Sequence, residues 1–356
     1  MKKVQDTNIE GKDRIPSPLE FREKVRQSEN SNETVLAARS AISDIVGGRL
    51  DSFLVIVGPC SIHDKDSAIE YARRLRKLSQ ELSGRVFVVM RTYFEKPRSV
   101  SGWKGLMSDP LLDGSNDISL GIGLCREIAC TITDMGMPIA IEALDPHFAP
   151  FFTDLASYAA IGARTVASQT HRAMASGLSM PVGFKNATSG GEKSAVEAIK
   201  FASGKHQFPG IDSLGQLSNI KTLGNPSGHL ILRGSDAGPN HDAKSIAGAL
   251  ALLKKYGLRE SVIVDCSHGN SGKDHSKQAA VLRDVVTQRA RGNSAIRGVM
   301  LESHLKEGKQ AVPDDFSELS RETVRRLDPQ ISITDSCIGW EETEALIREV
   351  DSKLRF

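Results

Sequence analysis

The sequence predicts an α/β protein, a (β/α)8 TIM barrel with an N-terminal extension and a small inserted β-hairpin. Eight short runs of apolar, often β-branched residues recur along the chain, and segments with helical periodicity separate them. Strands that alternate with helices form parallel sheets, because a parallel crossover needs a long connection. An open doubly wound sheet could also hold eight strands. A closed barrel is favoured because every run ends in polar or charged residues, and all eight strand ends of a barrel face one active site.

Composition sets broad limits on the class of protein. The 356 residues are 39% apolar and 25% charged, which is typical of a soluble globular protein. A formal net charge of +2 gives no argument for a nucleic-acid or membrane partner. No apolar run is long enough to cross a membrane, and the first residues lack the apolar centre of a secretory signal. The five cysteines lack C-x-x-C spacing and suit a reducing compartment, so we expect a cytoplasmic protein.

The N-terminal segment precedes the first strand. Residues 1–32 are polar and by themselves cannot bury much of a core. Residues 34–46 have helical periodicity, with Ser31 or Asn32 as the N-cap and a Gly47-Gly48 stop. We therefore expect one helix before the barrel.

The remaining elements follow in order along the chain. The expected strands lie in residues 53–57, 85–96, 137–145, 159–166, 180–188, 229–235, 261–268 and 297–304. The expected helices lie in residues 67–82, 118–135, 149–158, 169–176, 192–202, 243–256, 277–291 and 341–353. Two insertions interrupt the repeat. Residues 206–222 predict a hairpin with Gly215 at its turn, and residues 307–330 predict a polar loop or short helix.

Four residues near the strand ends could bind a metal ion. Cys60, His268 and Glu302 follow the first, seventh and eighth strands, which converge when a barrel closes, and Asp335 lies beyond the eighth. A thiolate, an imidazole and carboxylates suit a divalent ion such as Mn, Fe, Co or Zn. The alternative is a buried structural cysteine, a hydrogen-bonded histidine and two solvated acids.

A second group of residues at the strand ends is basic. Six cations at one mouth would repel one another unless an anion compensated them, and Arg and Lys bind phosphate and carboxylate groups. We therefore expect a ligand with at least two anionic groups. Lys185 could alternatively form a Schiff base, as barrel aldolases do. The six residues are Arg91, Lys96, Arg98, Arg164, Lys185 and Arg233.

Eight motifs together carry a resemblance to a known family. They are residues 58–64 (GPCSIHD), 93–98 (YFEKPR), 102–106 (GWKGL), 160–165 (AIGART), 181–186 (PVGFKN), 231–234 (ILRG), 265–268 (DCSH) and 333–341 (ITDSCIGWE). Over nearly all of residues 34–350 the chain resembles the class I 3-deoxy-D-arabino-heptulosonate 7-phosphate (DAHP) synthases. This family condenses phosphoenolpyruvate with erythrose 4-phosphate on a barrel that requires a divalent metal, the first step of the shikimate pathway.

The resemblance implies roles for individual residues. The implied metal ligands are Cys60, His268, Glu302 and Asp335. The implied substrate-binding residues are Arg91, Lys96, Arg98, Ser99, Ala163, Arg164, Lys185 and Arg233, of which Arg98 and Ser99 would hold the phosphate of erythrose 4-phosphate. The catalytic residues would be Lys96, Glu142, Lys185 and His268. Among these, Lys96 would donate a proton to the new hydroxyl group, and Glu142, alone or with Lys185, would orient the attacking water.

Two alternative functions stay open at this point. One is a synthase for another phosphorylated aldose, although the Lys96-Pro97-Arg98-Ser99 stretch favours erythrose 4-phosphate. The other is a catalytically silent barrel that regulates aromatic biosynthesis. Retention of all the candidate ligands argues against a silent barrel.

The resemblance also implies regulation and assembly. It predicts a homodimer or homotetramer in which residues 1–50 make oligomer contacts or take part in regulation, while residues 51–356 form the catalytic barrel. Members of the family are commonly inhibited by an aromatic amino acid. Pro146 and Gly210 favour tyrosine as the effector, and Ser179 completes the expected regulatory set.

Overall fold

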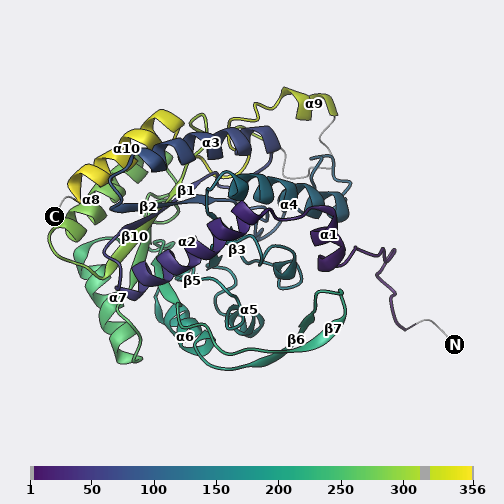
Figure 1. The fold of residues 1–356 in the computed structure, drawn as a ribbon, viewed down its shortest axis with the longest axis horizontal. Helices are drawn as coiled ribbons and strands as arrows, with labels where there is room; N and C mark the ends of the chain where they lie inside the picture. Colours follow the sequence, from purple (N-terminus) through teal and green to yellow (C-terminus); the bar gives the residue numbers. More distant parts are fainter. Residues whose placement is uncertain (1–3, 313–320, 355–356) are drawn as a thin grey trace.

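A computed structural model of the chain describes residues 4–312 and 321–354. Eight parallel strands form a closed barrel in the order β1-β10-β9-β8-β5-β4-β3-β2, which confirms the predicted TIM barrel (Figure 1). Each strand falls within or beside a run predicted from the sequence. They are β1 (Phe53–Gly58), β2 (Val86–Arg91), β3 (Ile139–Glu142), β4 (Tyr158–Ile161), β5 (Val182–Lys185), β8 (His229–Leu232), β9 (Val262–Asp265) and β10 (Ile296–Glu302).

Pairing between the first and last strands closes the barrel and brings distant residues together. Gly58 of β1 lies level with Glu302 of β10. Gly58 is needed there because a Cβ atom would lie 2.7 Å from the carbonyl oxygen of Arg91 on β2. The loop after β1, which carries Cys60, therefore starts at the level of Glu302.

Helices surround the strands, as the alternation predicted. They are α3 (Lys65–Glu81), α4 (Ile118–Asp134), α5 (Gln169–Ala175), α6 (Lys193–Ala202), α7 (Ala243–Lys255), α8 (Gln278–Ala290) and α10 (Trp340–Lys353). A short 3-10 turn, η2 (His275–Lys277), precedes α8.

The helix predicted over residues 149–158 is wrong. Only a 3-10 turn forms there, η1 (Ala149–Phe151), and Tyr158 already belongs to β4. Tertiary contacts hold this segment, among them those of the buried Arg126 side chain. It donates to the carbonyl oxygen of Phe151 at 2.6 Å and to both carboxylate oxygens of Asp154 at 3.0 Å. From Ser157 onward the backbone is paired with β3, since the Ser157 N–H donates to the carbonyl oxygen of Ile139 at 2.9 Å.

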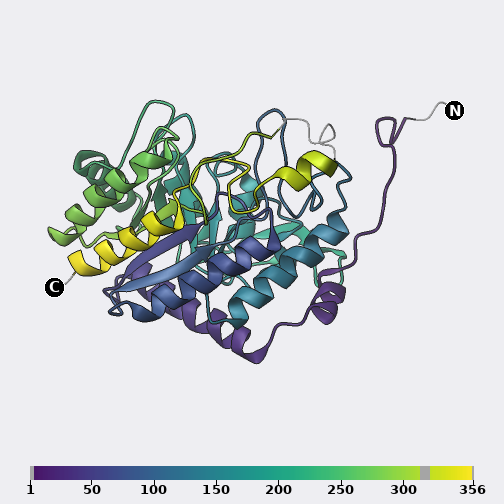
Figure 2. The same cartoon turned by 90° about the horizontal axis from the view of Figure 1, so that it is seen from above.

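A short helix, α1 (Pro18–Lys24), was missed in the polar N-terminal segment. Its N-cap is Ser17, and Ser17 and Glu20 exchange hydrogen bonds in a capping box. Residues 4–15 extend away from the body of the molecule in both views (Figures 1 and 2).

Helix α2 (Glu29–Gly47) closes the bottom of the barrel. It begins earlier than predicted, because its N-cap is Ser28 rather than Ser31 or Asn32, and it ends as predicted with Gly48 in the left-handed conformation. Buried side chains of α2 join the apolar cluster inside the barrel, among them Ala38, Ile42, Ile45 and Val46. The mouth at the opposite end is therefore the open one.

The two insertions differ in structure. The predicted hairpin is confirmed as β6 (Gln207–Ile211) and β7 (Leu217–Lys221), with Gly215 at a φ of +76° in the turn. The second insertion contains a short helix, α9 (Arg321–Arg326), while its residues 313–320 lie outside the described residues. None of the described helices is both long enough and apolar enough to span a membrane.

Candidate active site

A cavity of about 330 Å³ opens at the carboxyl ends of the barrel strands. All the predicted substrate-binding and catalytic residues line it together. They are Arg91, Lys96, Arg98, Ser99, Glu142, Ala163, Arg164, Lys185, Arg233 and His268. The residues come from strand ends and loops far apart in the sequence, and closure of the barrel brings them to one mouth.

Three of the four predicted metal ligands converge beside this cavity. The sulfur of Cys60 and one carboxylate oxygen each of Glu302 and Asp335 all lie within 4.8 Å of one another. The fourth residue, His268, directs Nε2 toward the same cluster, at 3.6 Å from Oε1 of Glu302. One thiol, one imidazole and two carboxyl groups at such distances fit a borderline divalent ion.

The Cys60 thiol is fully buried among charged groups. Burial and the Glu302 carboxylate raise its pKa to about 11, against the opposing charge of Lys96. The ammonium group of Lys96 lies 3.0 Å from the sulfur. Because a metal-bound thiol is deprotonated, an arriving cation would replace the thiol proton.

Arg91 contacts the Glu302 carboxylate of this cluster. Its guanidinium group is buried and donates a 2.8 Å hydrogen bond to Oε1 of Glu302. It also donates to the carbonyl oxygen of Pro59 at 3.2 Å and lies 3.8 Å from the ring centre of Tyr93. These contacts hold the Arg91 guanidinium in place, and its hydrogen bond restrains the orientation of the Glu302 carboxylate.

Three other arginines of the mouth have no salt bridge to any residue in the described ranges. Nε of Arg98 donates to the carbonyl oxygen of Trp103 at 2.8 Å, and Nε of Arg164 donates to the Ser99 hydroxyl at 3.2 Å. Among the described residues, the side chain of Arg233 donates only a long 3.4 Å hydrogen bond, to the carbonyl oxygen of Gly234. Guanidinium groups without acidic partners leave a surplus of positive charge, which suits an anionic ligand.

Sequence reasoning missed Asp265 as a site residue. It is the last residue of β9 and is completely buried. Its Oδ2 atom lies 2.8 Å from Nζ of Lys185 and 2.9 Å from Nδ1 of His268. Burial alone would raise the pKa of its carboxyl group, but the charges of His268 and Lys185 outweigh that effect and hold it well below the usual value. The position of Asp265 at the end of a strand-like run was the signal that could have found it.

Lys273 also lines the mouth and was not predicted. It and His268 are non-glycine residues with positive φ, at +63° and +54°. The Lys273 N–H donates to the carbonyl oxygen of His268 at 2.7 Å, which closes the loop between them. No sequence pattern indicates this conformation.

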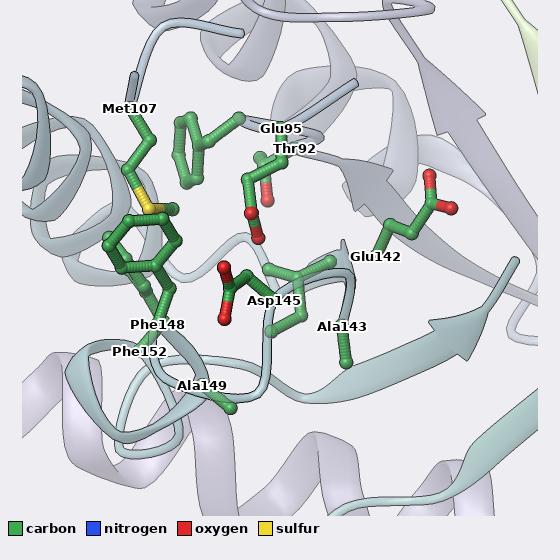
Figure 3. Close-up of a pocket in the computed structure, with 11 residues that line it drawn as sticks. Thr92, Glu95, Met107, Glu142, Ala143, Asp145, Phe148, Ala149 and Phe152 are labelled. Atoms are coloured by element: carbon green, nitrogen blue, oxygen red, sulfur yellow. The ribbon is translucent and has the colours of Figure 1, made fainter. Parts of the chain in front are cut away.

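A smaller pocket lies next to the mouth, and two acids meet in it. Figure 3 shows the carboxyl groups of Glu95 and Asp145 pointing toward one another, with Glu142 directed away from them. Burial, and then the charges of Asp145 and Glu142, raise the pKa of Glu95 well above its usual value. Glu95, which immediately precedes Lys96, is therefore harder to ionise than an exposed glutamate.

The three predicted regulatory residues lie in separate parts of the fold. Pro146 follows β3 and is half-buried, Ser179 is exposed just before β5, and Gly210 is part of β6. Their regulatory role stays a prediction.

The fold and the mouth define a (β/α)8 barrel enzyme that acts on anionic substrates. The family model described as the DAHP synthetase I family matches residues 24–348. The chain belongs to this family. The reaction of the family is the condensation of phosphoenolpyruvate with erythrose 4-phosphate in the first step of the shikimate pathway, as the motifs indicated.

Individual relatives agree with this assignment. The chain is 44% identical to the Tyr-sensitive phospho-2-dehydro-3-deoxyheptonate aldolase of Escherichia coli K12, over 99% of this chain and 96% of that one. It is 46% identical to the Phe-sensitive enzyme of the same organism, over 95% and 94%. The solved structure of the phospho-2-dehydro-3-deoxyheptonate aldolase from Francisella tularensis is similar with a TM-score of 0.93 and 40% identity, and covers 98% of this chain and 99% of that one.

Proposed function

We propose that the mouth of this barrel condenses phosphoenolpyruvate with D-erythrose 4-phosphate and water to form DAHP and inorganic phosphate, with the help of a divalent metal ion. The observation that carries the proposal is the position of the Cys60, Glu302 and Asp335 cluster beside a cavity whose arginines Arg98, Arg164 and Arg233 have no salt bridge among the described residues. Such a site can hold a metal ion and a doubly anionic substrate side by side.

The residues that would hold the ion are Cys60, His268, Glu302 and Asp335. Their mixed sulfur, nitrogen and oxygen donors suit Mn, Fe, Co or Zn. When bound, a divalent ion supplies Lewis-acid polarisation of the aldehyde group. Arg91 and Asp265 would orient two of these ligands, since they contact Glu302 and His268.

All these cations line one cavity, and the resemblance to the family assigns them to two groups. Arg91, Arg164, Lys185 and Arg233, with Lys96 and the Ala163 backbone, would bind the carboxylate and phosphate of phosphoenolpyruvate. Arg98 and Ser99 would bind the phosphate of erythrose 4-phosphate. Arg164 links the two groups, because its Nε donates to the Ser99 hydroxyl at 3.2 Å. The two substrates would thus be held next to one another for carbon-carbon bond formation.

Lys96 and Glu142 would handle the protons of the reaction. C3 of phosphoenolpyruvate adds to the aldehyde carbon, water adds to C2, and phosphate departs. Lys96 would protonate the new hydroxyl oxygen, and Glu142, with Lys185, would orient the water. Glu142 is held close to the backbone of the next strand end, since a Cβ atom at Gly162 would lie 2.1 Å from its Oε1.

A product assay tests this function. Chelator-treated protein is supplied with Mn²⁺, phosphoenolpyruvate and erythrose 4-phosphate, and phosphate release and the seven-carbon product are measured. We expect both, and no turnover without added metal. D-arabinose 5-phosphate serves as the matched aldose control. Preferential use of arabinose 5-phosphate would identify a synthase for another aldose, and failure with both would favour a silent regulatory barrel.

We further propose that the protein is a homodimer or homotetramer and responds to tyrosine. The relative from E. coli K12 named Tyr-sensitive supports this effector, and Pro146 and Gly210 favour it. Residues 1–50 would take part in the oligomer contact. Helix α1 lies beside the hairpin, since the Leu19 N–H donates to the carbonyl oxygen of Ser213 at 2.9 Å. This contact joins the N-terminal segment to the turn of the hairpin that carries Gly210.

A further inference from the structure

Asp265 occupies a central position beneath the mouth. Both of its carboxylate oxygens are engaged. Oδ1 accepts hydrogen bonds from the backbone N–H and the hydroxyl of Ser267, at 3.0 and 2.6 Å. Oδ2 faces Lys185 at 2.8 Å and His268 at 2.9 Å. The carboxylate is therefore fixed in orientation, and one of its oxygens is shared between an ammonium group and an imidazole.

The contact to His268 selects a tautomer of that histidine. Its Nδ1 faces two acceptors, Oδ2 of Asp265 and the Ser267 hydroxyl oxygen at 2.9 Å. The Ser267 hydroxyl hydrogen is directed to Asp265, so it is Nδ1 that carries a proton. Nε2 then presents its lone pair on the side where Glu302 lies 3.6 Å away. A carboxylate behind a metal-binding imidazole also raises the basicity of the coordinating nitrogen.

The contact to Lys185 links the same carboxylate to the anion-binding cavity. Within residues 4–312 and 321–354, Asp265 is the side chain that pairs with the Lys185 ammonium. Lys185 lines the mouth together with Arg164 and Arg233. An anion bound there competes with Asp265 for the ammonium group.

We infer that Asp265 is a positioning residue that couples metal binding at His268 to anion binding at Lys185. The inference rests on the proposed function, because it takes His268 as a metal ligand. When an anion draws Lys185 toward the cavity, Oδ2 is left to the imidazole N–H, and Nε2 becomes a stronger donor. Phosphoenolpyruvate therefore raises the affinity for the metal ion, and the metal ion raises the affinity for phosphoenolpyruvate by the same factor.

A Co²⁺ titration tests this coupling without relying on turnover. Chelator-treated protein is titrated with Co²⁺, followed by visible absorption, with and without saturating phosphoenolpyruvate. In wild type we expect phosphoenolpyruvate to lower the Co²⁺ Kd about tenfold. In Asp265→Asn we expect a Co²⁺ Kd about 10 to 100 times higher than in wild type. The effect of phosphoenolpyruvate on that Kd should shrink to about twofold or less.

A matched control and a second measurement complete the test. Asp284→Asn removes a carboxylate that also contacts a histidine, Nδ1 of His241 at 2.8 Å, and should leave Co²⁺ binding unchanged. In case Asp265→Asn does not fold, ¹⁵N spectra of histidine-labelled wild type at alkaline pH, assigned with His268→Gln, report the His268 tautomer. We expect the proton on Nδ1.

The possible outcomes distinguish failure of the role proposed for Asp265 from failure of the proposed metal site. Wild-type Co²⁺ affinity and full coupling in Asp265→Asn, or a proton on Nε2 of His268, would overturn the role of Asp265 while the proposed reaction stands. Wild type that binds no Co²⁺ at this site would contradict the ligand set itself, and the coupling with it.

Discussion

The ammonium group of Lys96 lies 3.0 Å from the sulfur of Cys60 and 3.3 Å from the carbonyl oxygen of the same residue. Burial would lower the pKa of Lys96, but electrostatic interaction with Cys60 and Glu302 outweighs burial and holds it above the usual value. Lys96 therefore carries its proton when substrates arrive, between the proposed metal ligands and the anion-binding cavity. This is where a proton donor to the new hydroxyl group has to be.

Lys96→Met tests the proton donor. We expect kcat to fall by about 10² to 10⁴, because a positioned general acid contributes about that much. The measurement is steady-state phosphate release at saturating substrates. Lys104→Met, which changes an exposed lysine of the same loop, is the control and should keep kcat within about twofold. Near-normal turnover in Lys96→Met would remove the proposed role.

Arg98→Met tests the phosphate site for erythrose 4-phosphate. Loss of a charged hydrogen bond of about 1.5 to 3 kcal/mol should raise the KM for this substrate roughly 10- to 150-fold. The KM for phosphoenolpyruvate should stay unchanged. Arg85 lies just before β2, at the other end of the barrel. The variant Arg85→Met is therefore the matched control. If the KM for phosphoenolpyruvate rose more than the KM for erythrose 4-phosphate, Arg98 would belong to the phosphoenolpyruvate site instead.

His229 gives a prediction for stability against pH. It is buried inside the barrel, where Nε2 lies 2.8 Å from the Tyr158 hydroxyl, and burial lowers its pKa to about 4. The unfolded chain takes up this proton near pH 6.5, whereas the native protein does so only near pH 4. The unfolded state thus binds more protons between these values. The free energy of unfolding should fall on acidification, with His229 contributing about 1.4 kcal/mol per pH unit.

Urea unfolding of His229→Gln at pH 7.5, 6 and 5 measures this contribution. We expect a shallower loss of stability on acidification than in wild type. His147→Gln, on the exposed loop after β3, should retain the wild-type slope. An unchanged slope in His229→Gln would contradict a neutral buried histidine.

Titration with aromatic amino acids tests the effector. We expect tyrosine to inhibit turnover, and Pro146→Leu to weaken that inhibition about tenfold while kcat stays the same. Activity is measured against increasing tyrosine, phenylalanine and tryptophan in parallel. Inhibition by phenylalanine alone would overturn the assignment to tyrosine.

The sequence predicted the barrel well because its signals are local and repeated. The apolar strands and the helices between them appear as periodic patterns, and Gly48 and Gly215 mark a helix end and a hairpin turn through their positive φ. The helix expected over residues 149–158 did not form, and there Arg126 binds the Phe151 carbonyl while the Ser157 N–H pairs with Ile139 of β3. Such a tertiary contact leaves no trace in local periodicity.

The candidate site was predicted in part for a similar reason. Residues at strand ends, such as Cys60 and Glu302, could be placed at one mouth once a barrel was assumed. Asp265 also lies at a strand end, but its importance depends on contacts to Lys185 and His268 that only the three-dimensional arrangement provides. Lys273 adopts a left-handed backbone conformation in its loop, and a lysine at this position does not predict that conformation.

The most direct test of the account is the location of a bound ion. Crystals of chelator-treated protein are soaked with Mn²⁺, and anomalous diffraction locates the metal. We predict one strong peak within bonding distance of Cys60 Sγ, His268 Nε2 and the carboxylates of Glu302 and Asp335. A peak elsewhere in the barrel, or none at the concentration of Mn²⁺ that supports turnover, would contradict the account.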